Sequence, residues 1–155
     1  MRKIILSLTL LVVLVPVAQS ETPKEGQFGL GVIAGEPTGP CFKLWTSQRT
    51  AIDGAVAWSF AKNARIHLHA DYLFHVYDLI DVETGRLPLY YGIGGRIRFG
   101  EGDRDDNIGI RIPVGLAYLV ENVPLDIFFE IVPILDLAPD TDLDFNAALG
   151  VRYFF

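Results

Sequence analysis

His67, His69 and Asp71 are three potential metal ligands at alternate positions of one segment. Alternate side chains of a β-strand point to the same face, so the three would lie together. Two histidines at this spacing can share a zinc ion, and such a site would need two further ligands from neighbouring strands. The alternative is a packed polar network, because buried polar groups need hydrogen-bond partners in any case. We predict the polar network, and therefore neither a metal ion nor another cofactor.

Ser59 and His67 are candidates for nucleophilic catalysis. A serine hydrolase requires a serine, a histidine and an orienting acid within reach of one another, together with an oxyanion hole. The sequence around Ser59 lacks the strained turn that presents such a nucleophile. The alternative role for this small side chain is to fill a protein interior. We predict that the chain has no catalytic residue and is not an enzyme.

Fourteen ionisable residues, the two histidines among them, follow the same alternation. On the polar side of successive segments they are interleaved with glycine and alanine, for example at Gly29, Gly31, Gly92 and Ala117. Five cations and six carboxylates nearly balance, which indicates ion pairs, because an unpaired charge in a dry interior is costly. The predicted polar network consists of Lys43, Asp53, His67, His69, Asp71, His75, Arg96, Arg98, Arg111, Asp126, Glu130, Asp136, Asp144 and Arg152.

These positions belong to segments of period two that are separated by turn-forming residues at short intervals. Short links between consecutive strands favour an up-and-down antiparallel barrel, which has no free edge. We predict an all-β fold with eight strands: Gln27 to Gly35, Cys41 to Ser47, Ala51 to Phe60, Arg65 to Tyr77, Leu89 to Phe99, Ile108 to Leu119, Leu125 to Leu137 and Leu143 to Phe155.

The apolar side of each predicted strand could face either a protein core or lipid, since both give the same alternation. The glycines distinguish between these two environments of the apolar side. On the outer wall of a soluble barrel a mid-strand glycine only weakens the sheet. Inside a narrow eight-stranded barrel, glycine and alanine leave room for arginine, histidine and aspartate. We therefore predict a transmembrane β-barrel with apolar side chains toward lipid and the charged residues in its lumen.

Aromatic residues give a second indication of a membrane barrel, because such barrels carry aromatic girdles at both membrane interfaces. With both chain ends at one rim, one predicted girdle consists of Phe28, Tyr91, Tyr118, Tyr153 and Phe155. The girdle at the other rim consists of Trp58, Phe60, Phe99 and Phe145.

The first twenty residues have the pattern of a secretory signal peptide. Arg2 and Lys3 precede an apolar run, and Ala18-Gln19-Ser20 is typical of a cleavage site. The apolar run is too short for a stable membrane-spanning helix. Residues 21–155 then form one domain outside the cytoplasm. The net charge of −6 argues against nucleic acid as a partner, and Cys41, the only cysteine, has no internal disulfide partner.

Six motifs and the C-terminus carry a resemblance to a known family. The motifs are Gly29-Leu30-Gly31-Val32, Glu36-Pro37-Thr38-Gly39, Leu68-His69-Ala70-Asp71-Tyr72, Leu87-Pro88-Leu89-Tyr90-Tyr91-Gly92-Ile93-Gly94-Gly95-Arg96, Pro124-Leu125-Asp126-Ile127 and Thr141-Asp142-Leu143-Asp144-Phe145-Asn146. They resemble a widespread family of short, functionally uncharacterised outer-membrane β-barrel proteins, which is compared with the membrane domain of OmpA and with OmpX. The pair Phe154-Phe155 is similar to the C-terminal signature that the barrel-assembly machinery recognises. The resemblance implies a fold and a location, and it brings no catalytic residues.

The sequence thus predicts a monomeric integral protein of the bacterial outer membrane, with a closed polar lumen and a structural or surface-interaction role in the envelope. Its expected partners are outer-membrane lipid, lipopolysaccharide and, through the C-terminal aromatic residues, the barrel-assembly machinery. Two alternatives stay open. One is a narrow ion or solute pore, and the other is a lipid A-modifying enzyme that would use Ser59 and His67.

Overall fold

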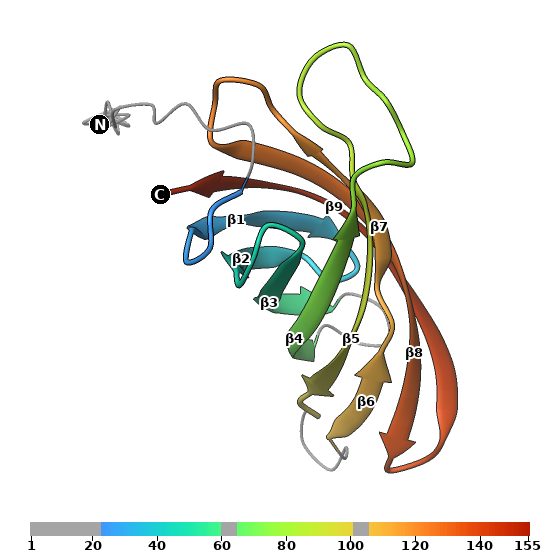
Figure 1. Cartoon of the computed structure of the whole chain (residues 1–155). Coiled ribbons are helices and arrows are strands. Elements are labelled where there is room, and N and C mark those ends of the chain that lie inside the picture. The colour runs from blue at the N-terminus through green and yellow to red at the C-terminus, as the bar shows by residue number, and fades with distance from the viewer. Residues whose placement is uncertain (1–22, 60–64, 101–105) are drawn as a thin grey trace, which may run out of the picture.

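The computed structural model describes residues 23–59, 65–100 and 106–155. The predicted signal peptide and Phe60 lie outside the described residues. Within the described ranges every regular element is a β-strand (Figure 1). No helix in these ranges is long and apolar enough to span a membrane.

Nine strands follow one another along the chain. They are β1 (Phe28–Gly35), β2 (Gly39–Trp45), β3 (Thr50–Ser59), β4 (Arg65–Val76), β5 (Leu89–Arg98), β6 (Asn107–Arg111), β7 (Val114–Leu119), β8 (Leu125–Ala138) and β9 (Asp142–Phe154).

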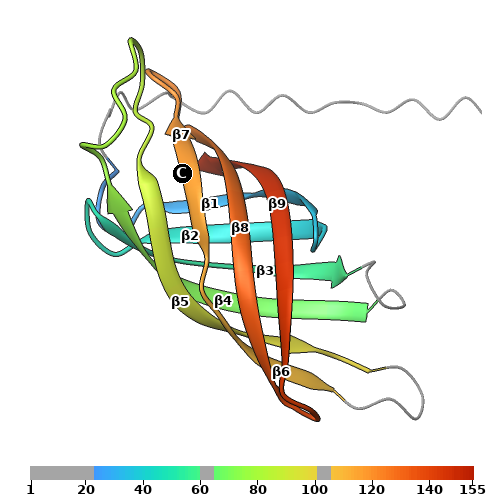
Figure 2. The same ribbon diagram turned by 90° about the vertical axis from the view of Figure 1, so that its right-hand side faces the viewer.

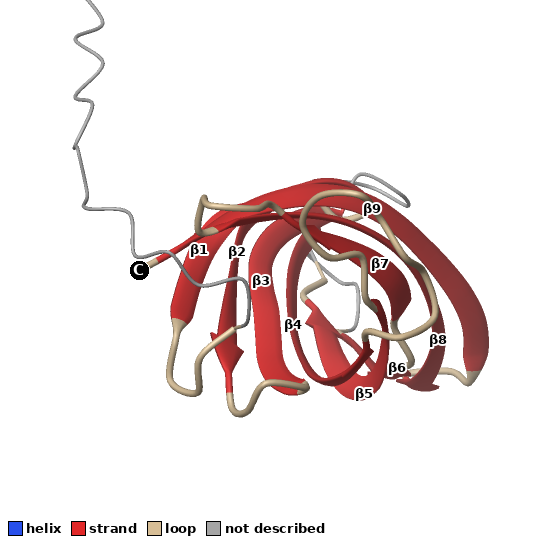
Figure 3. Ribbon diagram, turned by 45° about the horizontal axis from the view of Figure 1, so that its top comes forward, coloured by secondary structure: helices blue, strands red, loops and turns tan. Residues whose placement is uncertain are grey.

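The strands form a closed antiparallel ring. Apart from β6 and β7, neighbours in sequence pair with each other, and β1 also pairs with β9, where Leu30 lies opposite Tyr153. Both β6 and β7 lie between β5 and β8, so together they occupy one place in the ring. The ring therefore has eight strand positions. Figure 3 shows the strands arranged around a common interior.

The prediction of an all-β fold with eight antiparallel, up-and-down strand positions is confirmed, and the predicted bounds agree within two residues. The sixth predicted strand, Ile108 to Leu119, is wrong in one respect. It is interrupted between β6 and β7 at Ile112-Pro113. Proline has no backbone N–H, so Pro113 cannot donate a hydrogen bond to a neighbouring strand, although its backbone oxygen accepts one from Gly92.

The two faces of the ring differ sharply in chemistry. The outer face is apolar and exposed: Ile93 and Leu149 have 59% and 55% of their surface accessible. The inner face is charged and buried, because Arg96 and Glu130 are each only 2% exposed. This is the reverse of a soluble protein, in which apolar side chains fill the core.

Both ends of the described chain lie at one end of the ring, which we call the proximal end (Figure 1). The loop of residues 77–88, between β4 and β5, also lies there and is the longest link between described strands. We call it the rim loop. The opposite, distal end carries the link from β8 to β9. Figure 2 shows β7, β8 and β9 running across β1, β2 and β3 on the other wall, as strands of a tilted barrel do.

Candidate functional site in the polar interior

The fourteen ionisable residues predicted for the lumen all lie on the inner face of the ring. Thirteen of them are buried, and the side chain of Asp144 is 23% exposed. They come from β2, β3, β4, β5, β6, β8 and β9, so seven strands contribute. The inward-facing side chains meet in three groups along the interior.

The group nearest the proximal end is centred on Arg152 of β9. Its Nε donates to Asp126 Oδ1 at 3.0 Å, and its Nη1 donates to Asp53 Oδ2 at 3.2 Å. Lys43 Nζ lies 3.7 Å from Asp126 Oδ2 and 2.9 Å from His75 Nε2. Two cations and two carboxylates therefore neutralise each other in this group.

The middle group is centred on Arg111 of β6. Arg111 Nε donates to Asp71 Oδ1 at 3.0 Å, and Arg111 Nη2 lies 3.5 Å from Glu130 Oε1. The hydroxyl of Tyr90 donates to the second oxygen of Glu130 at 2.9 Å. Tyr90 thus belongs to the network although the sequence analysis did not include it.

The distal group joins two arginines to two aspartates. Arg96 binds Asp136 through two parallel bonds, of 3.1 Å from Nε and 2.6 Å from Nη2, which is the strongest geometry for this pair. Arg96 Nη2 also donates to Asp144 at 2.9 Å. Arg98 Nη2 lies 3.5 Å from Asp136 and 3.4 Å from Asp144.

Several of these ion pairs cross the interior rather than joining neighbouring strands. Arg152 of β9 reaches Asp53 of β3, and Lys43 of β2 reaches Asp126 of β8. Neither pair of strands is adjacent in the ring. Side chains can meet in this way only where the interior is narrow, so the pairs both fill the lumen and hold opposite walls together.

The histidines and Asp71 do not converge on a metal position. His69 Nδ1 lies 3.1 Å from His67 Nε2, so the two rings are hydrogen-bonded to each other. Asp71 is bound to Arg111 instead. Within the described residues, no group of three or more His, Cys, Asp and Glu side chains is arranged to hold a metal ion.

Ser59 and His67 do not form a catalytic pair. The hydroxyl of Ser59 donates to the carboxylate of Glu36 in a short hydrogen bond, and the nearest polar partner of His67 is His69. Among the described side chains, no hydrogen bond connects Ser59 with His67. The chemistry that a serine nucleophile needs, activation by an adjacent base, is therefore absent from this arrangement.

A set of large apolar side chains also faces inward, and the sequence analysis missed it. Trp45 and Phe154 lie near the proximal end with ring centroids 6.5 Å apart, and the His75 ring lies 4.4 Å from Trp45. Lys43 Nζ lies 4.3 Å from the centre of the Trp45 ring, a cation–π contact. We call Trp45, His75 and Phe154 the proximal plug, because their buried rings pack together inside the ring at this end. Strand parity alone would have placed Trp45 and Phe154 inside.

The predicted girdle residues lie on the outer face near the strand ends. Phe28, Tyr91, Phe155, Trp58, Phe99 and Phe145 are exposed, and Tyr118 and Tyr153 are partly exposed. Neighbouring rings contact each other, as Tyr153 and Phe155 do at a centroid distance of 5.3 Å.

Comparison with solved structures gives an informative likeness. No protein-family model matches the sequence, and no curated protein matches it. A solved structure, the N-terminal β-barrel domain of OprF from Pseudomonas aeruginosa, superposes with a TM-score of 0.63. The match covers 86% of this chain and 100% of that domain, at 11% sequence identity. The two chains share the β-barrel fold. At this identity the likeness concerns the fold alone, so it supports the predicted resemblance only at that level.

Proposed function

We propose that this protein is an integral β-barrel of the bacterial outer membrane with a structural or surface-interaction role and a closed lumen. One observation carries the proposal: the exposed outer wall is apolar and the charges lie inside. No outward-facing position of the described strands carries a charged residue. A soluble protein rarely exposes apolar patches of more than a few hundred Å², whereas lipid requires such a surface.

The length of the strands agrees with a membrane-spanning role. A transmembrane β-strand needs about 9–11 residues. Strands β4, β8 and β9 have 12, 14 and 13 residues. The exposed aromatic residues near the strand ends are then the interfacial girdles, and outer-membrane lipid and lipopolysaccharide are the partners of the outer wall.

The crossing ion pairs and the proximal plug support a closed lumen. A pore would need space for water and ions along the axis, yet Arg152 and Lys43 each pair across the interior with carboxylates on non-adjacent strands. We therefore favour a closed barrel over a narrow pore. The engagement of Ser59 with Glu36 disfavours a lipid A-modifying enzyme.

The closed ring also bears on assembly and oligomeric state. Every described strand position has two neighbours, which supports a monomer. Phe155 is exposed, whereas Phe154 is buried against Trp45. We propose that the barrel-assembly machinery recognises both residues before the ring closes, because Phe154 is covered afterwards.

Fractionation of cells tests the location. We expect the protein in the outer-membrane fraction, and we expect an unboiled sample to migrate differently from a boiled one on a denaturing gel, because a closed barrel resists unfolding by detergent. A monomer released by salt into the soluble periplasmic fraction would contradict the proposal.

Paired substitutions on β9 test whether the outer wall faces lipid. Leu149 lies in the middle of β9 and Leu143 near its distal end, and both are exposed. In a membrane, Leu149→Arg should reduce the free energy of unfolding by about 2–4 kcal/mol, and Leu143→Arg by at most about 1 kcal/mol, because the cost of a charge depends on depth. Urea unfolding in lipid vesicles measures both. Equal, small effects of the two substitutions would mean that the outer wall does not lie in lipid.

A further inference from the structure

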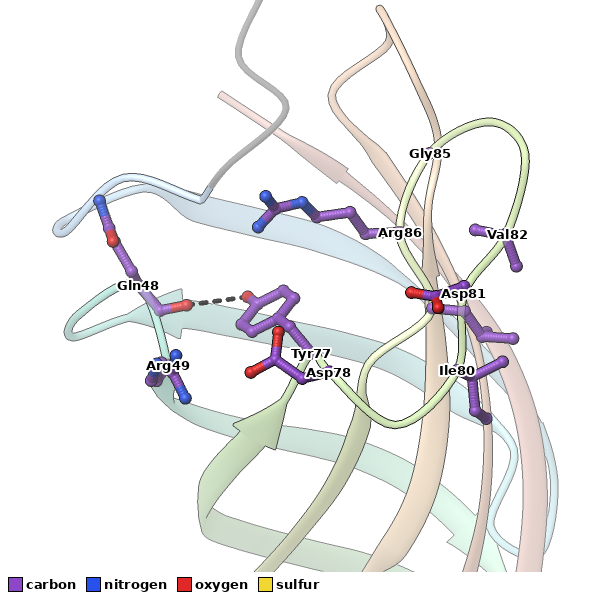
Figure 4. Close-up of a pocket in the computed structure, with 10 residues that line it drawn as sticks. Gln48, Arg49, Tyr77, Asp78, Ile80, Asp81, Val82, Gly85 and Arg86 are labelled. Carbon is purple, nitrogen blue, oxygen red and sulfur yellow. Dashed lines mark hydrogen bonds between the residues drawn. The ribbon is translucent and has the colours of Figure 1, made fainter.

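A pocket of about 380 Å³ lies at the proximal end, between the rim loop and the turn from β2 to β3 (Figure 4). Gln48 and Arg49 of the turn line one side, and Tyr77, Asp78, Asp81 and Arg86 of the rim loop line the other. Binding sites for small molecules have volumes of about 300–1,000 Å³. The pocket is therefore large enough for a small ligand.

Hydrogen bonds hold the walls of the pocket in place. The hydroxyl of Tyr77 donates to the backbone oxygen of Gln48 at 2.8 Å, which ties the rim loop to the turn. The backbone of Arg86 exchanges two hydrogen bonds with Leu119, of 3.0 and 2.7 Å. The hydroxyl of Tyr118 donates to the backbone oxygen of Thr84 at 3.0 Å. The pocket is thus preformed, which reduces the entropy lost on binding.

The charges of the pocket are balanced but not paired with each other. Arg49 and Arg86 are exposed cations, and Asp78 and Asp81 are exposed carboxylates. In the described part of the chain, none of the four forms an ion pair within 4 Å. Two positive and two negative groups are therefore available to a ligand that reaches the pocket.

Tyr77 orients one of the cations and adds no charge of its own. The Arg86 guanidinium lies 5.2 Å from the centre of the Tyr77 ring, a stacking contact that limits its freedom. Burial raises the pKa of the Tyr77 phenol to about 12, so the hydroxyl stays neutral at physiological pH and keeps donating to Gln48.

We propose that this pocket binds a small zwitterion of the amino-acid or short-peptide class. The ligand's carboxylate would lie against Arg49 and Arg86, because a guanidinium fork matches a carboxylate. Its ammonium group would lie against Asp78 and Asp81. A ligand with a single charge would pair with only two of the four charged side chains of the pocket. His75 Nδ1 of the proximal plug lies 3.1 Å from the backbone oxygen of Arg49, so the pocket adjoins the plug and the ligand binds at the mouth of the barrel.

The inference requires only the rim loop and the adjacent turn, so it is independent of the membrane placement proposed above. It is tested with the purified full-length protein, folded in detergent micelles, by isothermal titration calorimetry. The probe is the dipeptide Ala-Ala. Two blocked forms serve as comparisons: acetyl-Ala-Ala, which lacks the ammonium charge, and Ala-Ala amide, which lacks the carboxylate. We expect saturable binding of Ala-Ala and at least about tenfold weaker binding of each blocked form, because each loses charge-assisted hydrogen bonds.

Substitutions test whether the pocket residues bind the two charged groups of the ligand. Arg86→Gln should weaken Ala-Ala at least about tenfold, and Asp81→Asn should do the same. Lys24→Gln and Glu25→Gln are matched controls, because both residues are exposed near the same end and neither lines the pocket. Both control variants should bind as the unmodified protein does.

Several results would overturn the proposal. These are no saturable binding of Ala-Ala, equal affinity for the blocked forms, or unchanged affinity of both Arg86→Gln and Asp81→Asn. Tighter binding of O-phosphoethanolamine than of Ala-Ala would also contradict it, because it would assign the cationic side to a phosphate, as in a lipid headgroup. The comparison of the three peptides needs no variant, so the proposal stays testable if a substitution prevents folding.

Discussion

Replacing Gly31 with valine will prevent β1 from pairing with β9 and leave the ring open. A Cβ atom on Gly31 would lie 1.9 Å from the backbone oxygen of Val151 and 2.7 Å from the Cα of Arg152. Overpacking a folded interior costs about 1–3 kcal/mol where side chains can adjust. Here the obstacle is backbone, which cannot move without breaking the β1–β9 ladder. We therefore expect a loss of more than about 3 kcal/mol, a large part of the total stability of a domain.

Urea unfolding in detergent micelles, together with the yield of the folded band on unboiled gels, measures this effect. Gly95→Val is the matched control. Gly95 also lies within a strand, but it is on the outer face, and the nearest atom to an added Cβ is the backbone oxygen of Gly109 at 3.7 Å. The control should fold with nearly normal stability. A Gly31→Val protein with the midpoint of the unmodified chain would show that the close contact between β1 and β9 is not as described.

Arg152→Met should have the second large effect, a loss of about 3–5 kcal/mol, because breaking a buried ion pair leaves an uncompensated charge. Arg152 is buried and holds both Asp53 and Asp126. After the substitution, Lys43 still lies 3.7 Å from Asp126, but Asp53 has no other ion pair among the described residues. The uncompensated Asp53 carboxylate then accounts for most of the loss.

The urea midpoint in micelles measures this loss, and a second variant separates charge from packing. Arg152→Met combined with Asp53→Asn removes one cation and one carboxylate together and leaves Lys43 paired with Asp126. It should recover much of the lost stability, because the interior no longer contains unmatched charge at this level. Methionine keeps most of the length that packs over Phe128, whose ring centre lies 3.8 Å from the Arg152 guanidinium. If the single variant were within about 1 kcal/mol of the unmodified protein, the proximal group would contribute little.

The fold could be predicted from the sequence because one simple pattern persists along the chain. In β9, alternate positions from Leu143 to Tyr153 are apolar, and those between them are polar or small. A shift of one residue would turn every side chain to the wrong face, so the pattern specifies the register. The interruption at Pro113 was also visible in the sequence, but the periodicity on both sides of it suggested one strand.

The details of the interior could not be predicted in the same way. Which arginine binds which carboxylate depends on the tilt and stagger of strands on opposite walls, and a register shift at Ile108 and Gly109 adds to this. The proximal pocket was also beyond prediction. Its walls are residues of a turn and a loop without periodicity, and Tyr77 and Gln48 are 29 positions apart in sequence. Trp45 was missed for a different reason. The predicted interior set contained charged and small residues, and Trp45 is a large apolar residue that lies on the same face of β2 as Lys43.

The position of Arg152 in the final strand has a consequence for the order of assembly. Asp53 belongs to β3, which is synthesised long before β9. Its carboxylate therefore has no counterion until the last segment of the chain arrives. The N-terminal strands cannot complete a stable intermediate on their own, and a C-terminal truncation should be degraded rather than accumulate as a partial barrel.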